Sequence, residues 1–317
     1  MITRIEVDGF KSLRDFAIDL EPFTVLIGPN SAGKSNILDA LALLSRLASL
    51  PIAEAFKHGR GKSIDQFHRH GAEVATSIRF AVEFLEYGDY PKKSAREGGN
   101  AFQSRFRYEL TIERRPTRSG AEKLLVRDER LRAMRPEKDP WIASHPEFAA
   151  YAGYARAGED AFFTLVDQRS PTQRVIGLPS VYPQELNLDP TSVALGQMAH
   201  IHTLLVSANL QQCRVLDLGA ASLGASSERI DSGELSRDAA NLPTILAELP
   251  PEVLGEIRAD LVALVPGIAS FDVTPEGDDI RLDFVLSGGD RLPARLVSTG
   301  TLRVLALLTA LRMDPRP

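Results

Sequence analysis

The pattern of apolar and polar residues in the first fifty positions predicts three strands, a loop and a helix. Residues 2–7 alternate as a half-buried strand does, and residues 16–20 repeat that pattern. Residues 23–27 form a short apolar run, which predicts a buried central strand. After a glycine-bounded break at residues 28–33, apolar residues recur at helical spacing until Pro51.

Similar patterns recur along the rest of the chain. Further strands are predicted where apolar and polar residues alternate, at 74–86, 106–112, 123–127, 280–286 and 291–297. Further helices are predicted where apolar residues return every three or four positions, at 193–210, 241–264 and 301–311. Residues 139–190 have no clear period, so we expect irregular structure with short helices there.

The composition is that of a globular protein. Of the 317 residues, 44% are hydrophobic and 25% are charged, so global disorder is not expected. A single cysteine, Cys213, excludes an intramolecular disulfide and fits a reducing compartment. The first residues carry no signal-peptide pattern, and no apolar run is long enough to span a membrane. We therefore expect a soluble, cytoplasmic protein without a membrane segment.

Residues 28–35 match the phosphate-binding pattern G-x-x-x-x-G-K-[ST] at every fixed position. Glycines allow a loop whose backbone N–H groups point at an anion, and the helix that follows adds its positive end. Lys34 would reach the β- and γ-phosphates, and the hydroxyl of Ser35 would help to hold Mg²⁺. We therefore predict a Mg-ATP site formed by Gly28, Pro29, Asn30, Ser31, Ala32, Gly33, Lys34, Ser35 and Asn36.

The residues around this loop resemble the amino-terminal lobe of ABC-type ATPase heads. The likeness lies in residues 5–13, which contain Gly-Phe-Lys-Ser, and in residues 23–41, where Asn36 follows Gly-Lys-Ser. That group includes SMC and RecF proteins and AAA-type ATPases related to the overcoming-lysogenization-defect (OLD) proteins. The resemblance implies an α/β fold with a mixed sheet around the helix after the loop. It also implies that Lys11 and Ser12 lie near the base or ribose; a solvated turn is the alternative.

Heads of this class close ATP between two protomers, and the second protomer offers a Ser-x-Gly motif at a helix start. Residues 286–290 read Leu-Ser-Gly-Gly-Asp, but they lie between two alternating runs, so we interpret them as a hairpin turn. Residues 297–308 resemble the Ser-Asp-Gly-Thr-Leu-Arg stretch of the OLD-related ATPases, with Thr299 in place of the acidic residue. An ordinary capped core helix is the alternative. We predict that Ser298, Thr299 and Gly300 contact ATP in trans.

The resemblance also implies an apolar strand that ends in Asp-Glu, the Asp for Mg²⁺ and the Glu to polarise the attacking water. No apolar strand of this chain runs directly into such a pair, so the catalytic residues are unknown. We infer an amino-terminal portion whose acidic strand is truncated, disordered or carried by another chain, and which alone binds ATP better than it hydrolyses it. We expect one P-loop domain over residues 1–317, with a possible inserted subregion at 91–190.

Two weaker signals concern a metal and nucleic acid. Gln66 is a candidate for the glutamine that senses Mg²⁺ and the γ-phosphate in the related heads, and a coincidental loop glutamine is the alternative. Residues 92–138 hold fourteen Lys and Arg against seven Asp and Glu, a local charge of +7 in a chain whose net charge is −5. This stretch could bind the phosphates of DNA or form a solvated hairpin.

The sequence therefore predicts an ATPase head that dimerises on ATP, as a homodimer or with a partner ATPase or nuclease chain. By family analogy, its conformational switch would serve DNA repair or anti-phage defence. The first alternative is a non-hydrolysing ATP sensor that needs a partner chain for the Asp-Glu strand. A kinase or GTPase fits less well, because a GTPase would show an Asn-Lys-x-Asp motif and a kinase would not need Ser298 at a helix start.

Overall fold

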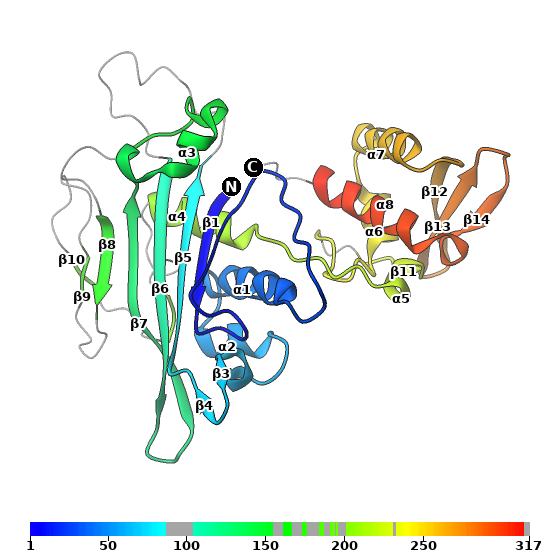
Figure 1. Ribbon diagram of the computed structural model, residues 1–317. Helices are drawn as coiled ribbons and strands as arrows, with labels where there is room; N and C mark the ends of the chain where they lie inside the picture. The colour runs from blue at the N-terminus through cyan, green and yellow to red at the C-terminus, as the bar shows by residue number, and fades with distance from the viewer. Residues whose placement is uncertain are drawn as a thin grey trace. The chain divides into compact units, whose positions relative to one another are not determined.

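A computed structural model of the protein describes residues 1–86, 104–154, 161–166, 173–175, 184–186, 191–193, 195, 201–230 and 233–313. These residues pack into two compact units, residues 1–214 and residues 215–317 (Figure 1). The sequence predicts one domain over this length, whereas each unit has a hydrophobic core of its own.

Unit 1 is built on a six-stranded sheet in the order β2-β1-β5-β6-β7-β8. Its strands are β1 (Ile2–Asp8), β2 (Phe16–Asp19), β5 (Ser77–Leu85), β6 (Arg105–Pro116), β7 (Glu122–Ala133) and β8 (Ala161–Val166). All five pairings are antiparallel. The predicted strands at the amino terminus, at 74–86, at 106–112 and at 123–127 are confirmed, and the last two extend well beyond their predicted ends.

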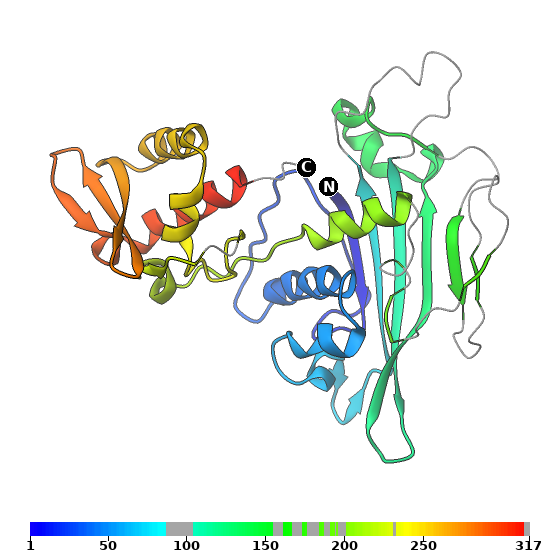
Figure 2. The same cartoon turned by 180° about the vertical axis from the view of Figure 1, so that it is seen from behind.

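Helices of unit 1 cover one face of this sheet, as Figure 2 shows for α1 (Lys34–Leu47) and α4 (Ile201–Gln211). Their apolar side chains, such as Leu43 and Val206, share one core with Ile5 and Phe80 of the strands. Shorter elements complete this side of the unit: α2 (Ile52–Lys57), the 3₁₀ turn η1 (Ser63–Gln66), β3 (Arg69–His70) and β4 (Glu73–Val74). The predicted helix after the glycine loop is confirmed, with Pro51 at the start of the next helix.

The second face of the sheet carries charged side chains, because alternate residues of a strand point to opposite faces. Across the strands, Arg4 is paired with Glu83, Glu83 with Arg107, and Arg107 with Arg132. One edge of this face meets η3 (Pro136–Lys138), α3 (Pro140–Ser144) and η4 (Pro146–Phe148). There the guanidinium of Arg105 lies 5.7 Å from the ring centre of Trp141. We call this surface the charged face.

The basic hairpin predicted within residues 92–138 lies at the centre of this sheet. β6 and β7 together form its longest pair of strands, with Phe106 opposite Ala133 and Pro116 opposite Glu122. Much of the predicted inserted subregion at 91–190 lies outside the described residues. Its described remainder contributes short strands, β9 (Gln173–Val175) and β10 (Gln184–Leu186), which pair with each other.

The predicted central strand at residues 23–27 is not formed in this structure. These residues are in no strand, and Phe23, Val25 and Ile27 are 84%, 62% and 90% exposed. An apolar run becomes a buried strand only where neighbouring strands accept and donate its backbone hydrogen bonds. Within the described part of the chain no backbone hydrogen bond joins residues 23–27 to another strand.

Unit 2 combines a small antiparallel sheet with a group of helices. The sheet contains β11 (Ser227–Glu228), β12 (Ile268–Glu276), β13 (Asp279–Leu286) and β14 (Arg291–Pro293). The helices are α5 (Ala220–Leu223), α6 (Leu242–Glu248), α7 (Pro251–Leu264), the turn η6 (Ala294–Leu296) and α8 (Thr299–Arg312). Phe271, Phe284 and Leu305 lie at the centre of its core. The predicted helix at 241–264 is split by Pro250 and Pro251.

The interpretation of residues 286–290 as a hairpin turn is confirmed. Gly289 has a φ of +91°, the left-handed region that glycine adopts without strain, and its N–H donates to the carbonyl of Leu286. The N–H of Leu286 in turn donates to Asp290 at 2.8 Å. This Ser-Gly-Gly string therefore joins β13 to β14 and starts no helix.

Candidate nucleotide site

The turn after β1 brings Lys11 and Ser12 against the glycine loop. Gly9 has a φ of +78°, and a Cβ there would lie 2.3 Å from the carbonyl oxygen of Ser77, so only glycine fits. The chain then reverses through paired backbone hydrogen bonds between Phe10 and Leu13. As a result, the side-chain amide of Asn36 donates to the hydroxyl of Ser12 at 2.7 Å.

The loop ends where α1 begins, and Gly33 makes that junction possible. Its φ of +90° is left-handed, and a Cβ at this position would lie 2.9 Å from the hydroxyl oxygen of Ser12. No side chain caps α1. Across the part of the chain that the structure describes, the N–H groups of Gly33, Lys34 and Ser35 have no acceptor. Such unpaired amides at the positive end of a helix are the donors that a phosphate group requires.

Lys34 is folded back onto its own loop. Its Nζ donates to the carbonyl oxygens of Gly28 and Pro29, each at 2.7 Å. The hydroxyl of Ser35, one residue along, belongs to an exposed residue. The lysine, the hydroxyl and the unpaired amides therefore lie on one short segment, in the sequence order found in loops that bind Mg²⁺ and a triphosphate.

A buried carboxylate beside the loop ties two cations to α1. Asp39 accepts from the Nζ of Lys11 at 2.6 Å and from the guanidinium of Arg60 at 2.5 Å. Burial alone would raise the pKa of the Asp39 carboxyl, but the hydrogen bonds from Arg60 and Lys11 outweigh it and lower that pKa. Arg60 also lies 3.4 Å from the carbonyl oxygen of Ser35. The resemblance implies that Lys11 lies near the base or ribose, which stays a prediction, and the sequence gives no signal for Arg60.

Gln66 supports the turn with its backbone. Its carbonyl oxygen accepts from the N–H of Lys11 at 2.9 Å. Its side-chain amide is buried and donates to the carbonyl oxygen of Phe56 at 2.6 Å. The metal-sensing role of Gln66 stays a prediction, and these contacts give its amide a packing partner.

The predicted trans contact lies in unit 2, at the start of α8. The hydroxyl of Ser298 accepts from the N–H of Thr301 at 3.2 Å, so the predicted cap is present. Ser298 and Gly300 are exposed and Thr299 is half-buried. The segment is therefore an open, capped helix start.

The chain's Asp-Glu dipeptide, Asp128-Glu129, lies inside β7 and not at the end of an apolar strand. Glu129 is buried and accepts from the hydroxyl of Tyr108 at 2.8 Å and from the N–H of Leu195 at 2.9 Å. Burial, helped by this carboxylate, raises the pKa of Tyr108 well above its usual value. The carboxylate of Glu129 is therefore used in hydrogen bonds within the protein, away from the glycine loop.

Comparison with known proteins agrees with this geometry. The model of the AAA ATPase domain family matches residues 1–144, which contain β1, the loop, α1 and the central strands of the sheet. Residues 1–144 are similar to the P-loop ATPase domains of SMC and OLD proteins. A family of this kind implies nucleotide binding at the loop, and the loop's free amides, Lys34 and Ser35 fit a Mg-nucleotide.

Curated relatives of the ATPase domain include SMC proteins and an OLD nuclease. The chain is 36% identical over 126 residues to the chromosome partition protein Smc of Synechocystis, covering 36% of this chain and 10% of that protein. It is 41% identical over 66 residues to structural maintenance of chromosomes protein 1 of Schizosaccharomyces pombe, covering 19% and 5%. It is 43% identical over 44 residues to the OLD nuclease of Thermus scotoductus, covering 14% and 8%.

The chain thus spans a tenth or less of the length of these relatives. Among solved structures, it is similar to a crystal structure of an SMC head bound to the C-winged helix domain of ScpA, with 15% identity and a TM-score of 0.47. That similarity covers 98% of this chain and 76% of the other. None of the described helices is long and apolar enough to cross a membrane.

Proposed function

We propose that the chain binds Mg-ATP through residues 28–36. The observation that supports this best is the run of unpaired amides from Gly33 to Ser35, directly beside the Nζ of Lys34. Lys34 would leave the carbonyl of Gly28 for the phosphate oxygens, and the hydroxyl of Ser35 would join the coordination shell of Mg²⁺. The bound Mg²⁺ supplies positive charge against the phosphates.

We further propose that ATP is closed between two copies of the chain. The exposed cap of α8, with Ser298 and Gly300, is suited to a γ-phosphate because its helix start is open. Closure on ATP and opening after hydrolysis would give a conformational switch. A role in DNA repair or anti-phage defence rests on the relatives of the ATPase domain.

Substitution of Ser298 by arginine tests closure. Ser298→Arg should leave ATP binding by the monomer unchanged and abolish the ATP-dependent increase in mass measured by light scattering. Ser287→Arg is the matched control, because Ser287 lies in the β13–β14 turn and should dimerise normally. Loss of dimers in the control but not in Ser298→Arg would assign the contact to the turn.

A second candidate function, an ATP sensor completed by another strand, is favoured by the exposure of Phe23, Val25 and Ile27. These side chains lead directly into the loop, and their backbone lacks strand partners in the described residues. We propose that an apolar strand ending in an acidic pair lies beside them in the hydrolysing state. It would supply the acidic pair that the described residues do not place at the loop.

Hydrogen exchange at residues 23–27 tests this candidate. In the isolated chain these amides should exchange as fast as those of an unfolded peptide, because they have no acceptors. In an assembly that hydrolyses ATP they should be protected. Strong protection in the isolated chain would contradict the open arrangement, and no protection in the active assembly would exclude the added strand.

A further inference from the structure

A pocket on the charged face has no part in the nucleotide site. It is lined by Glu83, Arg107, Arg132, Ala133, Met134, Arg135 and Lys138. It lies where β7 runs into η3, on the face of the sheet opposite α1, and it shares no residue with the loop at 28–36. Four of its lining residues are cations and one is an acid, so the lining is mainly cationic.

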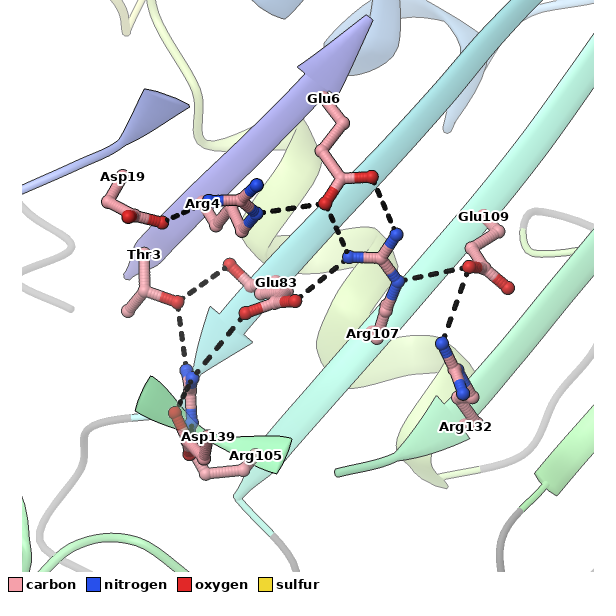
Figure 3. Close-up of polar contacts among 10 residues, drawn as sticks. All are labelled: Thr3, Arg4, Glu6, Asp19, Glu83, Arg105, Arg107, Glu109, Arg132 and Asp139. Atoms are coloured by element: carbon pink, nitrogen blue, oxygen red, sulfur yellow. Dashed lines mark hydrogen bonds and ion pairs between the residues drawn. The ribbon is translucent and has the colours of Figure 1, made fainter. Parts of the chain in front are cut away.

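Two of these cations face each other across adjacent strands. Arg107 of β6 is directly opposite Arg132 of β7, and Figure 3 shows both side chains beside Glu109. One carboxylate oxygen of Glu109 lies 3.0 Å from Arg107 and 3.4 Å from Arg132. Like charges directly opposite in a sheet are destabilising, so this arrangement needs further negative charge.

The acidic side chains nearby form ion pairs with Arg107. Its guanidinium binds Glu6 at 2.7 Å, Glu83 at 2.8 Å and Glu109 at 3.0 Å. Burial disfavours the charged form of Arg107, but hydrogen bonds to Glu6 and Glu109 outweigh it and raise its pKa. These acids therefore hold Arg107 in place, and among the described acids only Glu109 contacts Arg132, at the longer distance of 3.4 Å.

Arg132 has an unused donor. Its Nε is buried without a hydrogen-bond acceptor, the one such side-chain atom among the residues that the structure describes. A buried N–H without an acceptor is unfavourable, because the donor has lost its contact with water and gained none in return. Lys138 adds an exposed ammonium that forms no ion pair within the described ranges. An acceptor oxygen entering the pocket would contact Lys138 directly, and it would reach the buried Nε of Arg132 once that side chain shifts to expose it.

We propose that this pocket binds a phosphate group. A guanidinium presents parallel N–H donors that match two oxygens of a phosphate, and Lys138 would contact a third from η3. The charge of Arg107 is already neutralised by Glu6, Glu83 and Glu109, so the donors for the phosphate come from Arg132 and Lys138. The site is independent of ATP binding at Lys34, and its ligand is either a small phosphorylated molecule or the backbone of a nucleic acid.

The test follows the Nε–H signal of Arg132 by NMR in a Lys34→Ala chain, which removes phosphate binding at the loop. The signal is assigned by its absence in Arg132→Gln. Titration with inorganic phosphate should shift it, and a combined Arg132→Gln and Lys138→Gln change should weaken phosphate binding by about tenfold or more. Thermal unfolding of each variant confirms that it folds.

Arg130→Gln is the matched control, because Arg130 lies on the same strand and face but does not line the pocket. It should change phosphate affinity by no more than about twofold. Competition by a short oligonucleotide would identify nucleic-acid backbone as the source, and competition by adenosine monophosphate alone would identify a small molecule. An unmoved Arg132 signal, or an equal loss in Arg130→Gln, would overturn the proposal.

Discussion

The Nζ of Lys34 lies 2.7 Å from the carbonyl oxygen of Gly28, the residue at the opposite end of the same loop. It lies equally close to the carbonyl of Pro29. These two carbonyl oxygens are the acceptors of the Lys34 ammonium in this structure. On the proposed function, binding would exchange these two contacts of the ammonium with carbonyl dipoles for contacts with negatively charged phosphate oxygens.

Gly33→Ala should weaken ATP binding by about tenfold or more, because the left-handed backbone at Gly33 aims the loop's amides at the ligand. The matched control is Gly277→Ala, whose φ of +65° is also left-handed but whose Cβ would meet no atom within 4 Å. Both variants should lose about 1 to 2 kcal/mol of unfolding free energy. Only Gly33→Ala should lose ATP affinity in a calorimetric titration, and equal ATP binding by both variants would contradict this.

Asp39→Asn should make the chain less stable at neutral pH by about 1 to 2 kcal/mol, because Lys11 and Arg60 lose their shared carboxylate. The folded pKa of Asp39 is below its usual value, so its contribution is complete above the usual pKa and is lost as pH falls. Unfolding free energies of wild type and variant should therefore converge as the pH falls below the usual pKa of an aspartate and through the lowered pKa of Asp39. Two curves that stay parallel from neutral to acid pH would exclude this role.

Among the charge-removing substitutions, Asp139→Asn should lower the free energy of unfolding most. The carboxylate binds the fully buried Arg105 through two contacts of 2.6 and 2.7 Å and also accepts from the N–H of Ile142. Removing one partner of a buried ion pair costs about 3 to 5 kcal/mol.

Urea unfolding measures this loss, with Asp128→Asn as the control. Asp128 is 42% exposed and lies 3.4 Å from Arg127, so its removal should cost less than about 1 kcal/mol. If both variants lost similar amounts of unfolding free energy, burial of the Arg105–Asp139 ion pair would not explain its contribution to stability.

Replacing Phe23 and Val25 by serine should leave the thermal stability of the isolated chain unchanged, because both side chains are mostly exposed. Leu44→Ala is the comparison. Leu44 is 1% exposed in the core on α1, and its truncation should cost about 2 to 5 kcal/mol. A fall in melting temperature for the serine variant would show that residues 23–27 are packed in solution.

The sequence predicts most local elements correctly, because alternation in β1, β6 and β7 and the spacing in α1 are set by neighbours along the chain. It fails at residues 23–27. A run with four apolar residues out of five indicates a buried strand only if a partner strand is available, and the sequence pattern alone does not contain that condition.

The candidate site divides in the same way. The loop motif predicts Lys34 and Ser35 as contacts of phosphate and Mg²⁺, and the Phe-Lys-Ser turn predicts Ser12 near the nucleotide; these roles stay predictions. Arg60 and the Arg107–Arg132 pair are missed, since their meaning depends on contacts between residues far apart in sequence. The local charge of +7 also suggests free cations, whereas Arg105 and Arg107 are engaged with acids of the same sheet.

The central claim, that this loop binds ATP, is tested most directly by calorimetric titration of Mg-ATP into the wild-type chain, Lys34→Ala and Lys57→Ala. Lys57 is 67% exposed and distant in role, pairing only with Glu54 on its own helix among the described residues. The wild type and Lys57→Ala should bind ATP with the same affinity, and the affinity of Lys34→Ala should be lower by about tenfold or more. Unchanged affinity in Lys34→Ala would contradict the assignment of residues 28–36 as the nucleotide site.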